Sequence, residues 1–196
     1  MYKRQVLFAC LIGSALLFYA GWELIIVGLL CVLFAFLYTT GPYPLSYNGW
    51  GDVLVIVFFG FVPVGGTYYV QALTWTSDTT VASLICGLLI DTLLVVNNYR
   101  DREADARSGK RTVIVRFGEK FGRYLYLMLG VAASLLCFWF FFEGHLFAAL
   151  LPLLYLIPHV LTWRRMVQIH SGKKLNSILG ETSRNMLLMG ILLSIG

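Results

Sequence analysis

Two aspartates lie four positions apart, at Asp101 and Asp105, in the segment NNYRDREADARSGKRT that covers residues 97 to 112. In a helix that turns about 100° per residue, these two carboxylates and Asn97 fall on one flank. Proteins hold Mg²⁺ through one or two carboxylates, and substrate phosphates and water complete the shell. The spacing therefore fits a site for a Mg²⁺ ion and a diphosphate better than a cage for a bare cation.

Basic residues accompany the two acids. Lys110 and Arg111 follow within one or two helical turns, and Arg102 lies between the acids. Such cations form charge-assisted hydrogen bonds with phosphate oxygens and stabilise the negative charge that grows on a departing diphosphate. The alternative is an ordinary charged loop whose acids form salt bridges with its own arginines.

Asp91 interrupts the apolar run that precedes this segment. At about 1.5 Å per residue it lies about 12 Å from Tyr99 along a helix, near the middle of the hydrocarbon core. An ionised aspartate there costs about 2.5 to 3.5 kcal/mol, so it needs a partner, a wet cavity or a proton. We interpret Asp91 either as a cavity-lining group that borders an acceptor substrate or as a hydrogen-bonded residue of helix packing.

The chain as a whole has the composition of an integral membrane protein. It is 59% hydrophobic, 15% aromatic and 13% charged, with a mean hydropathy of +0.77, which is far too apolar for a soluble domain. A hydrocarbon core about 30 Å thick needs about 20 apolar residues in a helix. Continuous runs such as DVLVIVFFGFVPV exclude the alternating strands of an outer-membrane barrel. The predicted fold class is all-α, a polytopic transmembrane helix bundle.

Seven apolar runs are predicted to span the membrane, within a single domain that covers residues 1–196. Their approximate limits are residues 6–20, 24–38, 53–73, 80–99, 124–142, 146–163 and a last run from near residue 186 to 196.

The basic residues predict the orientation of these spans. All 15 lysines and arginines fall in three stretches, residues 3–4, 100–123 and 164–184. Alternating spans place these stretches on one side of the cell membrane, which the positive-inside rule makes cytoplasmic. The loop TTGPYPLSYNGWGD, residues 39–52, then lies on the same face as the aspartate segment. The net charge of +5 reflects this topology and indicates no nucleic-acid partner.

The segment at residues 97 to 112 resembles the second aspartate-rich motif of the UbiA superfamily, the intramembrane aromatic prenyltransferases. Within it the likeness is to the 1,4-dihydroxy-2-naphthoate polyprenyltransferases of menaquinone biosynthesis, in which asparagine pairs precede the aspartates and GKRT follows. Two further stretches, GPYPLSYNGWGD at 41–52 and GFVPVGGTYYVQ at 60–71, resemble the cytoplasmic loop and next helix of that branch. The resemblance runs through essentially the whole chain.

The resemblance implies a bundle of nine transmembrane helices around a cavity in which two aspartate-rich motifs bind Mg²⁺ and a polyprenyl diphosphate. The diphosphate leaves, and the ring of 1,4-dihydroxy-2-naphthoate attacks the allylic cation with loss of its carboxylate. Carried over by position, the metal and diphosphate side of the second motif is Asn97, Asp101 and Asp105, with Lys110 and Arg111 as neighbours of the diphosphate. In the resembling loop, the residues implied to border the acceptor are Tyr43, Tyr47 and Asn48.

One departure from the family pattern is large. The first aspartate motif, which follows the second helix of the family, has no counterpart in this sequence. We therefore expect a fragment that lacks two N-terminal helices, is incomplete at both ends, and by itself binds Mg²⁺-diphosphate poorly and turns over little. A smaller departure is Trp50, where the resembling loop has leucine.

Three other functions stay open at this point. One is a superfamily member with 4-hydroxybenzoate, haem or homogentisate as its acceptor. Another is a non-catalytic paralogue, which the missing first motif would allow. The third is a membrane transporter, although the sequence shows no internal repeat of the kind that transporters have.

Overall fold

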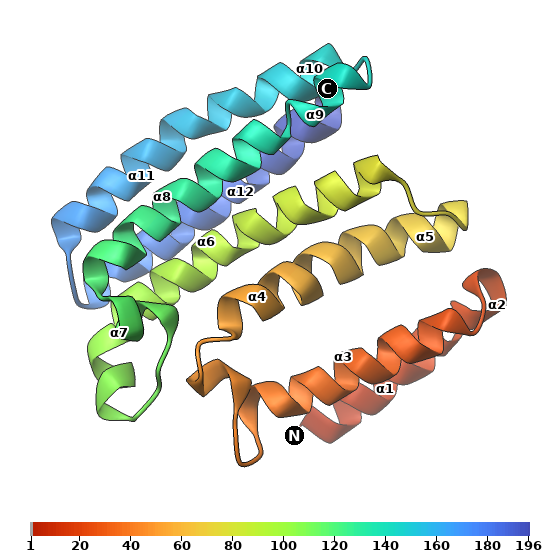
Figure 1. The fold of residues 1–196 in the computed structure, drawn as a ribbon, viewed down its shortest axis with the longest axis horizontal. Coiled ribbons are helices and arrows are strands. Elements are labelled where there is room, and N and C mark those ends of the chain that lie inside the picture. Colours follow the sequence, from red (N-terminus) through yellow and green to blue (C-terminus); the bar gives the residue numbers. More distant parts are fainter. Residues whose placement is uncertain (1) are drawn as a thin grey trace.

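The computed structural model describes residues 2–196, and every regular element in that range is helical (Figure 1). Within this described range, the helical segments long and apolar enough to cross a membrane are Gly51–Ala72, Ser77–Arg107, Glu119–Phe142, Leu146–Ile169 and Leu175–Ile195. Two shorter apolar helical segments, Arg4–Ala20 and Glu23–Thr39, precede them. The predicted fold class is confirmed, and each predicted apolar run corresponds to one of these segments.

The described residues form twelve α-helices, three short 3₁₀ helices and one π-helix. The α-helices are α1 (Tyr2–Ser14), α2 (Leu17–Ala20), α3 (Glu23–Thr39), α4 (Gly51–Val55), α5 (Gly66–Ala72), α6 (Ser77–Arg107), α7 (Val113–Phe117), α8 (Glu119–Leu136), α9 (Trp139–Phe142), α10 (Leu146–Leu150), α11 (Leu156–Ile169) and α12 (Asn176–Ile195). The 3₁₀ helices are η1 (Leu45–Tyr47), η3 (Leu151–Tyr155) and η4 (Lys173–Leu175), and the π-helix is η2 (Ile56–Gly65).

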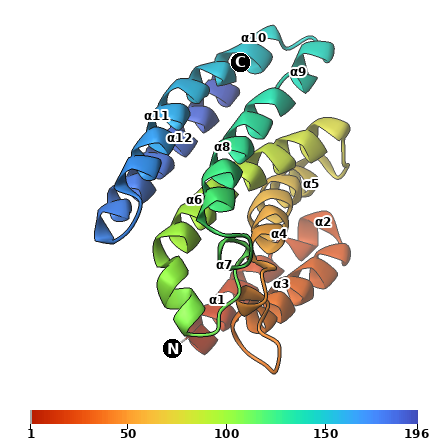
Figure 2. The ribbon, with the colours of Figure 1, turned by 60° about the vertical axis from the view of Figure 1, so that its left-hand side comes forward.

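Helix α6 lies at the centre of the arrangement. It contacts α8 and α12 on one side and η2 on the other, and the hairpin of α1 and α3 lies at the outer edge beside α4 and α5 (Figures 1 and 2). One end of the bundle gathers several helix termini (Figure 1). They are the C-terminal ends of α3, α6 and α11 and the N-terminal ends of α4, α8 and α12. This end carries the aspartate segment and the loop that precedes α4.

Helix α6 extends into the aspartate segment and contains both Asp101 and Asp105. Its first turn is capped by the Thr76 side chain, which accepts a hydrogen bond from the Thr79 amide at 3.1 Å. It ends at Arg107, and Gly109 follows with a φ of 77°, the left-handed conformation that glycine adopts readily after a helix. The assumption that the helix continues past Tyr99 to the two aspartates therefore holds.

The predicted start of the last span is wrong, because α12 begins at Asn176 and not near residue 186. Its first half is polar, and three of its polar residues, Glu181, Thr182 and Asn185, are buried against other helices. The Thr182 hydroxyl lies 3.0 Å from the Tyr126 hydroxyl, and the Asn185 amide donates to Thr162 at 2.9 Å. Internal hydrogen bonds satisfy this face, so a search for apolar runs alone missed that half of the helix.

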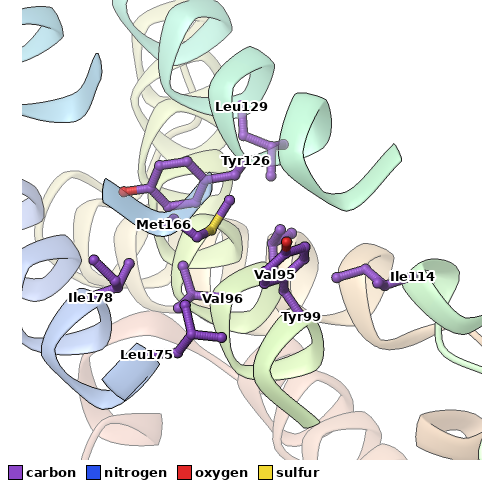
Figure 3. Close-up of a cluster of buried hydrophobic side chains, with 9 residues drawn as sticks. All are labelled: Val95, Val96, Tyr99, Ile114, Tyr126, Leu129, Met166, Leu175 and Ile178. Carbon is purple, nitrogen blue, oxygen red and sulfur yellow. The ribbon is translucent and has the colours of Figure 1, made fainter. Parts of the chain in front are cut away.

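Buried side chains from six elements fix the part of α6 at which the aspartate segment begins (Figure 3). They form one core cluster that joins α6, α7, α8, α11, η4 and the start of α12. Its members are Val95, Val96, Tyr99, Ile114, Tyr126, Leu129, Met166, Leu175 and Ile178. The position of the aspartate segment is therefore set by the main hydrophobic core.

Two glycines allow α6 and η2 to pack with their backbones close together. A Cβ atom on Gly60 would lie 2.5 Å from the Ser83 carbonyl oxygen, and one on Gly87 would lie 2.9 Å from the Ile56 Cα. Pro63 lies inside η2, where its missing N–H and its ring oppose a regular α-helical turn. This contact places the start of α4 beside the middle of α6.

We expect Gly60→Ala to lower the stability of the purified chain by about 1–3 kcal/mol, because the added methyl would force two backbones apart. The apparent melting temperature in detergent measures the effect. Gly66→Ala is the matched control, since a Cβ on Gly66, which lies in the same membrane segment, would meet nothing within 4 Å. Equal melting temperatures for the two variants would contradict the close contact.

Candidate active site

Asp101 is held by a neighbouring arginine on α6. Arg100 donates from Nε and Nη2 to the two Asp101 carboxylate oxygens, at 2.7 Å and 2.5 Å. The same guanidinium group donates to Oδ1 of Asn97 at 2.7 Å and to Oδ1 of Asn176 on α12 at 3.0 Å. Two of the residues predicted to share a flank, Asn97 and Asp101, are therefore joined through one cation.

Asp105 is paired with Lys110 across the turn that ends α6. Lys110 Nζ lies 3.2 Å from Oδ2 of Asp105, and the Lys110 amide donates to the Asp105 carbonyl at 2.9 Å. Both acids therefore have a basic partner within the segment, as the charged-loop alternative predicts. That alternative does not account for the cavity that Lys110 and Asn97 also line.

The loop before α4 is tied to the turn after α6 by main-chain groups. The Arg111 amide donates to the Tyr47 carbonyl at 2.7 Å, and Nη2 of Arg116 donates to the Asn48 carbonyl at 2.7 Å. Gly49 lies in this contact with a φ of 80°, and a Cβ there would lie 3.1 Å from the Arg111 carbonyl oxygen. The prediction that the two segments lie on the same face is confirmed.

A cavity of about 60 Å³ lies between these two segments and the middle of the bundle. It is bordered by the end of α3, the loop before α4, α4 itself, α6 and the turn after α6. The lining residues are Tyr38, Ser46, Gly49, Gly51, Asp52, Leu94, Asn97, Asn98, Lys110 and Thr112. A polar cavity of this size is large enough for water or for the polar edge of a ligand.

Two buried acid groups lie on helices α4 and α6, and of these only Asp52 lines the cavity. Asp91 on α6 is 1% exposed, and no protein group in residues 2–196 donates to its buried Oδ1 atom. Asp52 lies in the first turn of α4, and its Oδ1 atom has no protein donor in the described chain either. Sequence reasoning considered Asp91 but missed Asp52, whose only signal was a carboxyl group directly before a long apolar run.

Arg102 and Arg111 lie outside the cavity lining. Arg102 donates to Glu119 on α8 at 3.0 Å and to the Tyr99 carbonyl at 2.7 Å, and its guanidinium carbon lies 4.5 Å from the centre of the Tyr99 ring. Arg111 has an exposed side chain and contributes its main chain to the loop contact. The roles of both side chains toward a diphosphate stay predictions.

The three loop residues predicted to border an acceptor are also outside the lining. Tyr43 is 57% exposed and Tyr47 is 43% exposed, while the Asn48 amide donates to the Pro44 carbonyl at 2.8 Å and stabilises its own turn. The loop itself reaches the cavity through Ser46 and Gly49. A role for the other three side chains stays a prediction.

The oxygen donors of the aspartate segment are of the type that Mg²⁺ prefers. Asn97, Asp101 and Asp105 offer an amide and two carboxylates. In the described residues no group of three or more His, Cys, Asp or Glu could by itself hold a metal ion. These oxygen donors are of the kind that complete a Mg²⁺ shell together with phosphate and water oxygens, and a Mg²⁺ site at these residues stays a prediction.

Comparison with known proteins places these features in a family. A family profile described as the UbiA prenyltransferase family matches residues 4–186. The chain is 38% identical over 178 residues to a protein of Haemophilus influenzae named 1,4-dihydroxy-2-naphthoate octaprenyltransferase, covering 87% of this chain and 56% of that protein. Proteins of the same name match from Escherichia coli, at 38% identity over 67% of this chain and 44% of the relative, and from Mycobacterium tuberculosis, at 44% identity over 61% and 40%.

The chain thus spans about half the length of the curated relatives that it matches. No solved structure matches it with significance. The family profile covers the loop before α4, the whole aspartate segment and the membrane helices as far as residue 186, within α12. The chain is a multi-pass integral membrane protein and belongs to the UbiA prenyltransferase family.

Proposed function

We propose that this protein transfers a polyprenyl group from a polyprenyl diphosphate to 1,4-dihydroxy-2-naphthoate, with loss of the carboxylate, giving demethylmenaquinone. The observation that carries the proposal is the cluster of Asn97, Asp101 and Asp105 on one flank of α6, beside a cavity that Lys110 lines. The choice of acceptor is supported by the names of the relatives, since several are 1,4-dihydroxy-2-naphthoate octaprenyltransferases.

In this proposal the aspartate segment binds the diphosphate end of the donor. Asp101, Asp105 and Asn97 would hold Mg²⁺, which would supply positive charge to the diphosphate oxygens and so make the diphosphate a better leaving group. Lys110 donates to a phosphate oxygen and stabilises the charge that the leaving group gains. The ion pairs of Arg100 and Lys110 keep the carboxylates oriented before the substrate arrives.

We also propose that this end of the bundle faces the cytoplasm. The basic stretches 100–123 and 164–184 meet there, because Arg100 bonds to Asn176 and His170 lies 3.3 Å from an oxygen of Glu119. A polyprenyl chain attached to the bound diphosphate would then extend between helices toward the lipid, where exposed apolar side chains are abundant.

The activity assay uses the complete natural protein in detergent with Mg²⁺ and an all-trans polyprenyl diphosphate. Separate reactions contain 1,4-dihydroxy-2-naphthoate, 4-hydroxybenzoate or homogentisate. We expect prenylated product and released CO₂ with the naphthoate, and a kcat/KM at least about 100-fold lower with the other acceptors, since their rings and polar groups differ in placement. Equal or better turnover of another acceptor would replace the proposed substrate. Absence of any prenylated product would favour the non-catalytic paralogue.

A further inference from the structure

A second and larger cavity lies between α11 and α12, which run side by side (Figures 1 and 2). We call it the α11–α12 groove. Its volume is about 460 Å³, within the range of about 300–1,000 Å³ that is typical of small-molecule sites. Its lining residues all come from these two helices and differ from those of the cavity beside the aspartate segment. The groove is therefore a separate candidate site.

The charge of the α11–α12 groove is positive. Three arginines, Arg164, Arg165 and Arg184, line it together with one acid, Glu181. Nη1 of Arg165 lies 2.6 Å from a carboxylate oxygen of Glu181, so the charges of this pair offset each other. Arg164 and Arg184 form no ion pair within residues 2–196. The groove therefore presents one arginine from each helix without an acid to balance it.

Both of these arginines lie within helical segments that are apolar enough to span a membrane, Leu146–Ile169 and Leu175–Ile195. Arg164 lies about 8 Å along the axis from the end of α11, and Arg184 lies about 12 Å from the start of α12. An arginine at such a depth extends its side chain toward the interface or binds an anion, because a guanidinium group left in hydrocarbon is costly. The anion that a bilayer itself supplies near this level is the phosphate of a lipid.

Exposed apolar side chains continue the groove away from the helix ends that carry the basic groups. On α11, Leu161 and Ile157 precede Arg165 by four and eight residues, and both are exposed. On α12, the exposed Leu188 follows Arg184 by four residues. These intervals keep each apolar side chain on the helix face that carries the arginine. The surface is thus cationic near the helix ends and apolar deeper in the bilayer, which matches the headgroup and acyl chains of a phospholipid.

We propose that the α11–α12 groove binds an anionic phospholipid, with the phosphate at Arg164 and Arg184 and the acyl chains against Leu161 and Leu188. Arginine suits this role because its planar guanidinium group donates two parallel hydrogen bonds to a phosphate. Basic pockets between transmembrane helices are known to bind anionic headgroups. A zwitterionic headgroup fits less well, since the net positive lining repels its ammonium group. This binding does not depend on the proposed prenyl transfer.

Native mass spectrometry of the complete natural protein in detergent tests the proposal, because it resolves the first bound lipid from later ones. The probes are phosphatidylglycerol, which is anionic, and phosphatidylcholine with the same acyl chains, which is zwitterionic. We expect the dissociation constant for the first phosphatidylglycerol to be at least about 10-fold lower than that for phosphatidylcholine. Equal constants would overturn a site for an anionic headgroup.

Arg164→Gln and Arg184→Gln locate the binding. Each should raise the dissociation constant for phosphatidylglycerol by about 5-fold, and the two together by about 25-fold, since each removes one cation beside the phosphate. Both side chains are exposed, so the variants should keep the melting temperature of the unaltered protein. If the double variant binds the lipid as tightly as the unaltered protein, the lipid lies elsewhere and the proposal is wrong, as it would be if another part of the complete protein filled the groove.

Arg107→Gln is the matched control. Arg107 is also an exposed arginine at this end of the bundle, but it is the last residue of α6 and lies outside the groove. Its replacement should leave the dissociation constant for phosphatidylglycerol unchanged. A loss as large as that of the groove variants would show that general surface charge attracts the lipid, against a defined site.

Two soluble competitors distinguish a lipid from a free phosphate. Inorganic phosphate and glycerol 3-phosphate carry the anionic group without acyl chains. At about 1 mM, neither should displace phosphatidylglycerol, because the apolar face at Leu161 and Leu188 adds to the affinity of a lipid alone. Displacement by either competitor at that concentration would make the groove a site for a small phosphate and would overturn the proposal of a lipid.

Discussion

Replacing Asp101 with asparagine should lower the kcat/KM for prenyl transfer by about 1,000-fold in the complete natural protein. The substitution keeps the shape of the side chain but removes its charge and one acceptor oxygen. Arg100 donates hydrogen bonds to both carboxylate oxygens of Asp101 and to Asn97. The charge of Asp101 is therefore central to the proposed Mg²⁺-diphosphate site. Initial rates over a Mg²⁺ titration measure the effect, and the variant should also need more Mg²⁺ for half-maximal rate.

Glu103→Gln is the matched control for this experiment. Glu103 is an exposed acid on the same stretch of α6, and its carboxylate makes no ion pair in residues 2–196. We expect its activity to stay within about twofold of the unaltered protein, as is usual for an exposed charge. A similar loss in both variants would show that total charge matters and not the position of Asp101. Retained turnover in Asp101→Asn would refute the metal assignment.

Replacing Lys110 with methionine should lower kcat by about 100-fold and raise the KM for the polyprenyl diphosphate. Lys110 is the basic residue that lines the cavity, and its ammonium group lies 3.2 Å from Asp105 with the side chain only 22% exposed. Methionine preserves much of the apolar stem and removes the charge. Because the leaving group becomes more negative as its bond to the prenyl carbon breaks, the larger loss should appear in kcat and not in KM.

Lys120→Met removes a positive charge of the same kind from an exposed position in the first turn of α8. Its kinetic constants should remain near those of the unaltered protein. If the Lys110 variant changed only the KM, the lysine would serve ground-state binding of the diphosphate and not its departure. If both lysine variants lost activity together, long-range attraction of the anionic substrate would explain the result better than a contact.

The sequence predicted the helices well where apolar runs are continuous, and poorly where a helix has a polar inner face. The continuous apolar run before Asp101 predicted the membrane-spanning part of α6, and the assumption that the helix continues past Tyr99 agrees with its end at Arg107. The start of α12 was missed because Thr182 and Asn185 make it polar, and their partners Tyr126 and Thr162 lie on other helices. Such partners are a tertiary property that hydropathy along one segment does not contain.

In the candidate site, too, the sequence predicted positions along one helix but not contacts between helices. Spacing along one helix predicted that Asn97 and Asp101 share a flank, and the Arg100 bonds join them. Contacts between helices were not predictable in this way. Arg102 lies between the acids in sequence but turns to Glu119, and Asp52 reaches the cavity only because glycines let η2 approach α6. For the loop at residues 41–52, the resemblance to the family predicted where the loop lies but not where each side chain points.

The polar inner face of α12 has a consequence for biosynthesis in the membrane. This helix has a mean hydropathy of 1.2 in its best window, against 2.2 for Glu119–Phe142, so its own partitioning from the translocon into lipid is the weakest of the long helices. Its hydrogen-bond partners on α8 and α11 precede it in the chain and are synthesised first. Insertion of α12 is therefore assisted by a surface already assembled, and the order of translation is part of how this bundle forms.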